Sequence, residues 1–199
     1  MANAGRVIAG SARGIRLAAP GEETRPLADR VKQTLFAVLD PDLDEARVLD
    51  LFAGSGAAGI EALSRGAAMV VFVERSRDAC RVIERNLVAT HLSGGRSRVV
   101  RAEVVDHLRR AADATTDDRF DIVLLDPPYL DAPVRSAVLE LLGGEVGRRL
   151  LTPNARVVTT HDRRSAVPED CGLLASERQK RFGESTLTFY RRRAVNESR

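Results

Sequence analysis

The sequence predicts an α/β protein whose sheet is mostly parallel and ends in an antiparallel hairpin. From residue 47 onward, short apolar runs typical of buried strands alternate with longer runs that have helical spacing. This alternation is typical of a parallel sheet covered by helices on both faces. The last two strand-like runs, residues 172–182 and 185–193, are joined by Gly183-Glu184 with no helix between them, which indicates a hairpin.

The first 40 residues are expected to form a small hairpin and a helix ahead of this sheet. Two strand-like runs, residues 6–10 and 14–20, flank a turn-prone segment. Residues 27–39 place apolar side chains on one helical face, and a proline precedes them where a helix can begin. We therefore predict an N-terminal extension at 1–40, a main domain at 41–193 and a frayed tail at 194–199.

The main domain is expected to alternate strands and helices along its length. Strands are predicted at residues 47–52, 69–74, 97–103, 120–129 and 155–161. Helices are predicted at residues 59–67, 76–89, 104–112 and 133–142.

Composition excludes several classes of protein. Of the 199 residues, 44% are hydrophobic and 30% are charged, a balance typical of a globular domain. No apolar run is long enough to span a bilayer, and the N-terminus lacks the pattern of a signal peptide. Cys80 and Cys171 form no CxxC pair, and His91, His107 and His161 are isolated. We therefore expect free thiols, a cytoplasmic location and no metal site.

Charge is distributed unevenly along the chain. The net charge is +3, but residues 1–32 and 177–199 together carry 13 basic and six acidic side chains, which leaves these ends at +7 and the rest at −4. Basic ends around an acidic body favour a polyanionic partner, with ordinary solvated termini as the alternative. The candidate contacts to such a partner are Arg6, Arg13, Arg16, Arg25, Arg30, Lys32, Lys180 and Arg181.

A glycine-rich loop follows the first strand of the main domain. Gly54-x-Gly56-x-x-Gly59 has the spacing of a dinucleotide-binding fingerprint, at the strand end where open α/β sheets bind ligands. Glu74 ends the next strand, where a carboxylate can accept hydrogen bonds from both ribose hydroxyls. These features suit NAD and S-adenosylmethionine alike, and a purely structural glycine turn is a third interpretation.

Residues just before the glycines favour S-adenosylmethionine over NAD. An acid at Asp50 helps to place the positively charged amino-acid tail of S-adenosylmethionine, whereas it would repel the pyrophosphate of NAD. Phe52 and Ala53 precede the first glycine, where NAD-binding folds usually run straight from the strand into the glycine.

The tetrapeptide Asp126-Pro127-Pro128-Tyr129 follows the fourth strand. An exocyclic amine on a nucleobase is a poor nucleophile because its lone pair is delocalised into the ring. The Asp126 carboxylate and the Pro127 carbonyl can accept the hydrogens of such an amine, and Tyr129 offers a face for stacking an extruded base. A strand stop with a stacked tyrosine is the alternative. Together with the glycine loop and Glu74, the tetrapeptide favours methyl transfer to an amine.

With these motifs in place, the chain resembles the RsmD-type 16S rRNA (guanine(966)-N(2))-methyltransferases. The resemblance covers nearly the whole chain and is carried by residues 6–17, 25–36, 48–67, 126–129 and 180–190, together with Glu74. It implies a class I S-adenosylmethionine-dependent methyltransferase (Rossmann-like) fold with a small N-terminal extension. It also implies methylation of the exocyclic N2 amine of one guanine in 16S rRNA.

The resemblance further implies roles for particular residues. Many members place Asp or Asn after the third strand to read the cofactor adenine, and Glu103 stands there in this chain. Arg25, Asp29 and Arg30 belong to a segment expected to close as a lid over cofactor and RNA. The candidate cofactor contacts are thus Asp50, Phe52, Gly54, Gly56, Glu74 and Glu103, and the candidate catalytic residues are Asp126, Pro127, Pro128 and Tyr129.

The expected partner is 16S rRNA within a 30S subunit or an assembly intermediate, bound by a monomeric enzyme. Two alternatives stay open. An adenine-N6 methyltransferase acting on DNA or RNA shares the central motifs, although 199 residues leave no room for a large target-recognition domain. A ribosome assembly factor that binds S-adenosylmethionine without turnover would keep the same fold.

Overall fold

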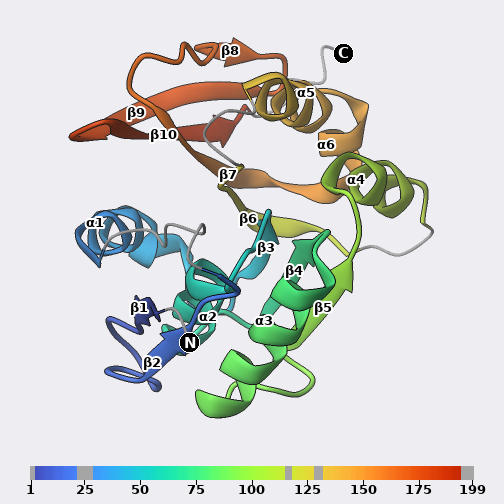
Figure 1. Ribbon diagram of the computed structural model, residues 1–199. Helices are drawn as coiled ribbons and strands as arrows, with labels where there is room; N and C mark the ends of the chain where they lie inside the picture. The colour runs from blue at the N-terminus through green and yellow to red at the C-terminus, as the bar shows by residue number, and fades with distance from the viewer. Residues whose placement is uncertain (1–2, 22–28, 115–117, 128–131, 194–199) are drawn as a thin grey trace. The chain divides into compact units, whose positions relative to one another are not determined.

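The computed structural model describes residues 3–21, 29–114, 118–127 and 132–193 (Figure 1). The predicted site residues Arg25, Pro128 and Tyr129 and the predicted tail at 194–199 lie outside the described residues. The chain divides into two compact units, residues 1–103 and 104–199. Within the described parts of both units, no helix combines the length and apolar character needed to cross a bilayer. The predicted boundary at residue 40 stays a prediction.

The first unit contains a parallel sheet flanked by helices. Strands β3 (Arg47–Leu51), β4 (Met69–Glu74) and β5 (Ser97–Arg101) pair in parallel, with β4 in the middle. Helix α2 (Ala57–Ser64) packs on β3 and β4, and α3 (Arg77–Ala89) packs on β4 and β5. The predicted strands and helices of this region are confirmed. The buried core includes Val48, Leu49, Ile60, Leu63, Phe72, Val73 and Ile83.

Helix α2 lies unusually close to the strand beside it, because Gly59 has no side chain. A Cβ at Gly59 would lie 2.3 Å from Cε1 of Phe72 on β4 and 2.9 Å from Oδ2 of Asp50 on β3. Both distances are shorter than van der Waals contact. The third glycine of the loop motif is therefore required by helix–sheet packing, which is the role of the third glycine in dinucleotide-binding folds.

The N-terminal segment forms a short hairpin followed by helical turns. Strands β1 (Asn3–Arg6) and β2 (Arg16–Ala18) pair antiparallel, and α1 (Asp29–Leu39) leads into the 3-10 turn η1 (Asp40–Asp42). The prediction of the first strand at residues 6–10 was wrong, because β1 ends at Arg6. The next backbone N–H groups, of Ile8 and Ala9, donate to the Glu61 carboxylate of α2 at 2.7 and 3.0 Å.

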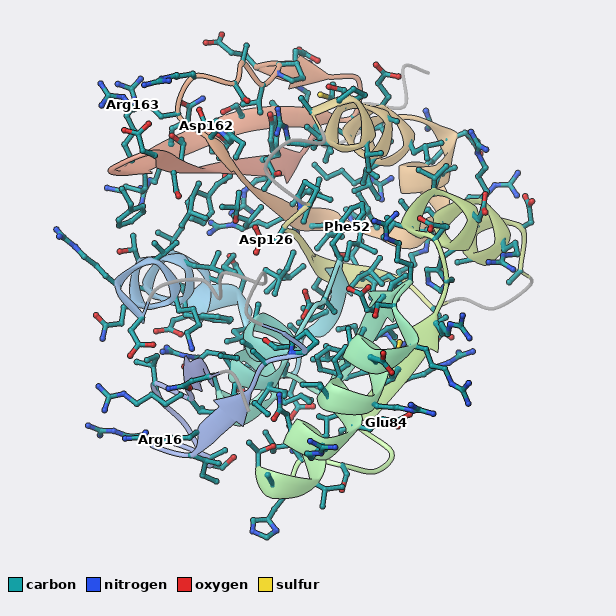
Figure 2. All side chains as sticks on the ribbon, in the orientation of Figure 1. Arg16, Phe52, Glu84, Asp126, Asp162 and Arg163 are labelled. Carbon is teal, nitrogen blue, oxygen red and sulfur yellow. The ribbon has the colours of Figure 1, made fainter. Side chains whose placement is uncertain are left out.

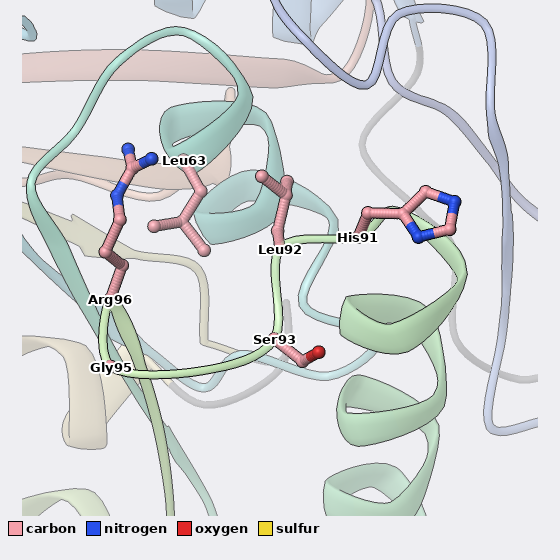
Figure 3. A pocket seen from close by; sticks show the side chains of 6 residues that line it. All are labelled: Leu63, His91, Leu92, Ser93, Gly95 and Arg96. Atoms are coloured by element: carbon pink, nitrogen blue, oxygen red, sulfur yellow. The ribbon is translucent and has the colours of Figure 1, made fainter.

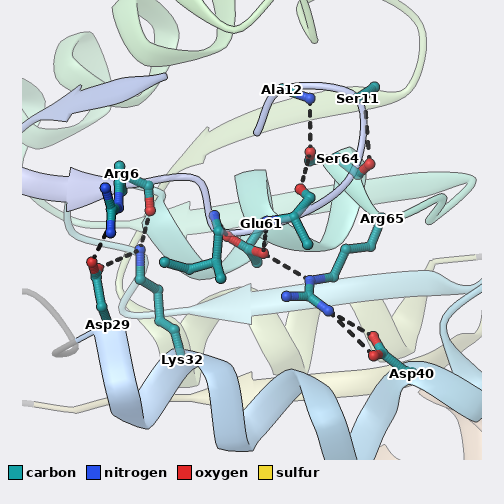
Figure 4. A network of polar contacts seen from close by, with 11 residues as sticks. Arg6, Ser11, Ala12, Asp29, Lys32, Asp40, Glu61, Ser64 and Arg65 are labelled. Carbon is teal, nitrogen blue, oxygen red and sulfur yellow. Dashed lines mark hydrogen bonds and ion pairs between the residues drawn. The ribbon is translucent and has the colours of Figure 1, made fainter. Parts of the chain in front are cut away.

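A network of polar contacts attaches this segment to α2 (Figure 4). Glu61 is fully buried, and it also accepts a hydrogen bond from Arg65 Nε at 2.7 Å. The Arg65 guanidinium reaches on to Asp40 of η1 at 2.9 Å. Ser64 Oγ accepts from the N–H of Ala12 at 2.9 Å and donates to the carbonyl of Ala9 at 2.6 Å. The hairpin and α1 are thus both fixed to the helix that follows the glycine loop.

The second unit contains a mixed sheet. Strands β6 (Phe120–Leu125) and β7 (Leu151–Asp162) are parallel, and β10 (Ser185–Arg192), β9 (Leu174–Phe182) and β8 (Asp170–Cys171) follow in that order by antiparallel pairing. The predicted C-terminal hairpin is confirmed as β9 and β10, at the red end of the chain in Figure 1.

Three helices accompany this sheet. They are α4 (Val104–Asp113), α5 (Ala132–Gly143) and α6 (Glu145–Leu150). Helix α6 packs on β7 as well as on α4 and α5. It was not predicted, and it ends where β7 begins at Leu151, four residues before the predicted strand.

The close approach of α2 to the sheet predicts a stability difference between two glycine substitutions. Gly59→Ala should lower the free energy of unfolding by about 1–3 kcal/mol, because the new methyl group overlaps the Phe72 ring. Gly95→Ala is the matched control, since a Cβ there meets no atom within 4 Å. It should change stability by less than about 0.5 kcal/mol. Urea denaturation of both variants measures the difference, and equal midpoints would contradict this account of α2 packing.

Candidate functional site

The predicted loop residues lie together in a left-handed turn between β3 and α2. Phe52, Gly54 and Gly56 have φ angles of +58°, +54° and +76°. The N–H of Gly56 donates to the carbonyl of Ala53 at 2.7 Å, which closes the turn. A left-handed phenylalanine is sterically costly and persists only where the surroundings impose it. Phe52 therefore marks strained backbone at the carboxyl end of β3.

The Asp50 side chain stabilises this turn through a hydrogen bond to α2. Its side chain is buried, and Oδ2 accepts a hydrogen bond from the N–H of Gly59 at 2.9 Å. Gly59 lies in the first turn of α2, where unsatisfied N–H groups and the helix dipole favour a negative charge. The carboxylate thus joins the end of β3 to the start of α2. Its predicted contact with the cofactor stays a prediction.

Glu74 and the glycine loop meet, as their positions on neighbouring parallel strands require. Glu74 Oε2 accepts from the N–H of Gly54 at 3.0 Å, and Oε1 accepts from the N–H of Ser76 at 2.8 Å. Glu103 follows β5, two residues beyond the partner of Glu74 in the β4–β5 register. It is 58% exposed and forms an ion pair with Arg75 at 3.7 Å. Both acids therefore lie at the carboxyl ends of their strands.

A shallow hollow elsewhere in the first unit is separate from this loop (Figure 3). It lies between the end of α3 and the start of β5, at the amino ends of the parallel strands. Its lining residues are Leu63, His91, Leu92, Ser93, Gly95 and Arg96. Among the residues that the structure describes, no group of three or more His, Cys, Asp or Glu side chains is arranged to hold a metal ion.

In the second unit, Asp126 and Pro127 directly follow β6. Asp126 is partly buried, and its carboxylate is hydrogen-bonded to the side chain of Thr160 on the neighbouring strand β7. Loss of solvation raises the pKa of Asp126 to about 6, although the Thr160 hydrogen bond opposes the shift. The group is therefore ionised at neutral pH but poorly solvated, as is common for carboxylates at functional sites.

One of the predicted basic contacts is wrong. The Lys32 side chain is fully buried, and Nζ donates to the carbonyl of Arg6 at 2.6 Å, with Asp29 at 3.8 Å. Burial lowers the pKa of Lys32, while the charges of Glu61 and Asp29 oppose that shift. The ammonium group thus supports the junction of β1 and α1 and is not available to a polyanion.

The other predicted basic residues that the structure describes are exposed. These are Arg6, Arg13, Arg16, Arg30, Lys180 and Arg181. Arg6 is engaged with Asp29 at 3.5 Å, whereas Arg16 projects outward from β2 (Figure 2).

Two further arginines, missed by sequence reasoning, join Lys180 and Arg181. Arg163 and Arg164 follow β7 and are exposed, and Arg163 projects outward in Figure 2. The N–H of Arg163 donates to the carbonyl of Glu184 in the β9–β10 turn at 2.7 Å. We call Arg163, Arg164, Lys180 and Arg181 the basic cluster. It lies at the carboxyl end of β7, the edge at which Asp126 follows the parallel strand β6.

Comparison with known proteins identifies the family. The family described as "Conserved hypothetical protein 95" matches residues 5–191. The chain belongs to this family. Ribosomal RNA small subunit methyltransferase D of Haemophilus influenzae is 36% identical over 172 residues, which are 85% of this chain and 86% of the relative. The protein of the same name from Escherichia coli is 32% identical over 194 residues, 97% and 92% of the two chains. The resemblance to RsmD-type proteins is thereby confirmed.

Solved structures confirm the fold. The yhhF protein from Escherichia coli superposes with a TM-score of 0.79 at 31% identity, covering 95% of this chain and 98% of that one. An RNA methyltransferase from Salinibacter ruber in complex with S-adenosyl-L-homocysteine gives a TM-score of 0.62 at 16% identity, covering 88% and 98%. This chain therefore has the predicted class I methyltransferase fold.

The raised pKa of Asp126 predicts that its charge costs stability. A carboxylate whose pKa is raised to about 6 on folding lowers stability at neutral pH by up to about 3 kcal/mol, and by less here because part of the side chain stays solvated. Asp126→Asn keeps an oxygen that can accept from Thr160 and removes the charge. We expect it to raise the free energy of unfolding by about 1–2 kcal/mol at pH 7.5 and to lose this advantage near pH 4, where the aspartate is protonated.

Thermal denaturation at both pH values measures this effect. Asp113→Asn is the control, because Asp113 is 84% exposed. It should shift stability by less than about 0.5 kcal/mol. If Asp126→Asn changes the free energy of unfolding equally at pH 7.5 and at pH 4, desolvation of Asp126 is not the dominant effect.

Proposed function

We propose that this protein transfers the methyl group of S-adenosylmethionine to the exocyclic N2 amine of a guanine in 16S rRNA. The observation that carries the proposal is the Asp126 carboxylate, held beside Thr160 at the end of β6 as the first residue of Asp-Pro-Pro-Tyr. Relatives named for small-subunit rRNA methylation, matched over most of the chain, support the substrate class.

Residues of the first unit fit the cofactor. The open side of Gly54, where a Cβ would meet nothing closer than 3.9 Å, lets a ligand approach the backbone. We assign the ribose hydroxyls to the Glu74 carboxylate, which accepts from the N–H groups of Gly54 and Ser76. We assign the adenine amine to Glu103, which also forms an ion pair with Arg75. When bound, S-adenosylmethionine supplies a methyl group already activated by its sulfonium charge.

Residues at Asp126 orient the acceptor. The Asp126 carboxylate, ionised above pH 6, has only acceptor atoms, and Pro127 contributes a carbonyl and has no N–H donor. These oxygens accept the two hydrogens of the guanine amine, which leaves the nitrogen lone pair available to accept a methyl group. The new C–N bond forms as the C–S bond breaks, and the nitrogen then releases a proton to Asp126 or to water. The rate gain comes from positioning and from a poorly solvated charge.

The test is methyl transfer from labelled S-adenosylmethionine to 30S subunits that lack the modification, followed by nucleoside analysis. We expect N2-methylguanosine at one site, and we expect Asp126→Ala to bind cofactor normally but to lose transfer by at least about 100-fold. N6-methyladenosine would instead identify the adenine-N6 alternative. Cofactor binding without transfer to any RNA would favour the assembly-factor alternative. Unchanged transfer by Asp126→Ala would contradict the role of Asp126.

RNA binding should depend on the basic cluster. Replacing Arg163 and Arg164 together by Gln should weaken binding to 30S subunits and lower the slope of log K against log salt by about 1.5, since each phosphate contact contributes about 0.7–0.9. The matched control replaces Arg109 and Arg110, an exposed pair on α4, in the same way. Equal salt slopes for the two double variants would rule out phosphate contacts by Arg163 and Arg164.

A further inference from the structure

Asn86 on α3 bonds to two segments that are distant in sequence. Its Oδ1 accepts from the N–H of Ala18 at 2.9 Å. Its Nδ2 donates to the carbonyls of Ala18 and Ser55, each at 2.9 Å. The side chain is buried, and a buried amide is tolerated only when its polar atoms are paired. The N–H of Ala18 needs an acceptor and its carbonyl needs a donor. Together these two bonds fix the orientation of the Asn86 side-chain amide.

The two segments held by Asn86 are the proposed cofactor loop and the N-terminal hairpin, whose Arg16 is one of the predicted RNA contacts. Ser55 lies between Gly54 and Gly56 in the cofactor loop. Ala18 ends β2, the strand that begins at the exposed Arg16.

Helix α3 also supports the cofactor loop one turn earlier. A Cβ on Gly56 would lie 3.1 Å from Ile83, which precedes Asn86 by three residues on the same face of the helix. One face of α3 therefore carries both the cofactor loop and the N-terminal hairpin.

We propose that Asn86 is a positioning residue that couples the N-terminal hairpin to the cofactor loop, so that RNA bound by the hairpin and cofactor bound at the loop strengthen each other's binding. This inference rests on the proposed function. A contact that fixes β2 also fixes the amide, and the amide fixes the Ser55 carbonyl. Binding that shifts β2 therefore moves the Ser55 carbonyl through the amide, and binding that shifts the loop moves β2, so the coupling is reciprocal.

A purely structural role is the competing explanation. In that case Asn86 would only satisfy buried backbone groups, and its replacement would lower stability without changing the coupling. Thr90 provides the comparison, because it is buried at the C-terminal cap of α3 and its hydroxyl donates to the carbonyls of Asn86 and Leu87 in that helix. Thr90→Val removes buried hydrogen bonds without touching Ala18 or Ser55.

The experiment measures the Kd of labelled S-adenosyl-L-homocysteine by equilibrium dialysis, with and without unmethylated 30S subunits. Asn86→Asp keeps the acceptor for Ala18 and removes both donors. In the wild type we expect 30S subunits to tighten the Kd by about fivefold or more, a typical coupling. Asn86→Asp should weaken the Kd about tenfold without 30S subunits and reduce the effect of 30S subunits to less than about twofold. Thr90→Val should keep both wild-type values.

The outcomes separate this inference from the proposed function. A wild type whose cofactor affinity does not respond to 30S subunits would overturn the coupling while leaving methyl transfer untouched. Wild-type coupling in Asn86→Asp, or equal losses in Asn86→Asp and Thr90→Val, would overturn the role of Asn86. Circular dichroism of each variant confirms folding before dialysis. A wild type that binds no S-adenosyl-L-homocysteine would instead count against the proposed function, and the coupling would fall with it.

Discussion

The close approach of Gly59 to Phe72 is the constraint on which the geometry of the glycine loop depends. Only a residue without a side chain lets α2 lie so close to β4, and this position brings the N–H of Gly59 to the Asp50 carboxylate. The end of β3 and the start of α2 are thereby joined by a tight turn, in which Phe52 has a left-handed conformation. The hydrogen bond from Gly54 to Glu74 depends on that turn. Loop chemistry is therefore set by helix–sheet packing.

Buried charge attaches the N-terminal segment to this turn. A buried carboxylate is costly unless it is paired, and Glu61 accepts from two backbone N–H groups and from Arg65. Arg65 in turn lies over the Phe36 ring of α1 at 5.0 Å and bonds to Asp40. Such contacts are directional, so they fix the position of the hairpin and of α1 more closely than apolar burial would. The segment that carries Arg16 thus has a defined place relative to α2.

The helices, strands and loop that depend on local sequence patterns could be predicted. The features that depend on strand register or on buried polar contacts between distant residues could not. Helix α3 and strand β4 follow from apolar spacing, and the loop between β3 and α2 follows from the spacing of its glycines. Lys32 was predicted as a polyanion contact from the basic charge of residues 1–32. A charge count does not reveal that its ammonium group is buried against the Arg6 carbonyl and near Asp29. Arg163 lies at the same end of the sheet as Lys180 and Arg181 because of the register of β7, β10 and β9, which no local pattern reveals.

The carboxylates of Glu61 and Asp126 have different surroundings, which distinguish a structural role from a proposed chemical role. Glu61 is surrounded by donors that hold the fold together. Asp126 has a pKa raised above that of an unfolded aspartate, so folding takes up a proton between about pH 4 and pH 6. The contribution of Asp126 to stability is therefore lost as pH rises through this window and stays lost at neutral pH. A fold that keeps an ionised group where it weakens stability has a use for that charge, and the proposed use is to accept the hydrogens of the guanine amine.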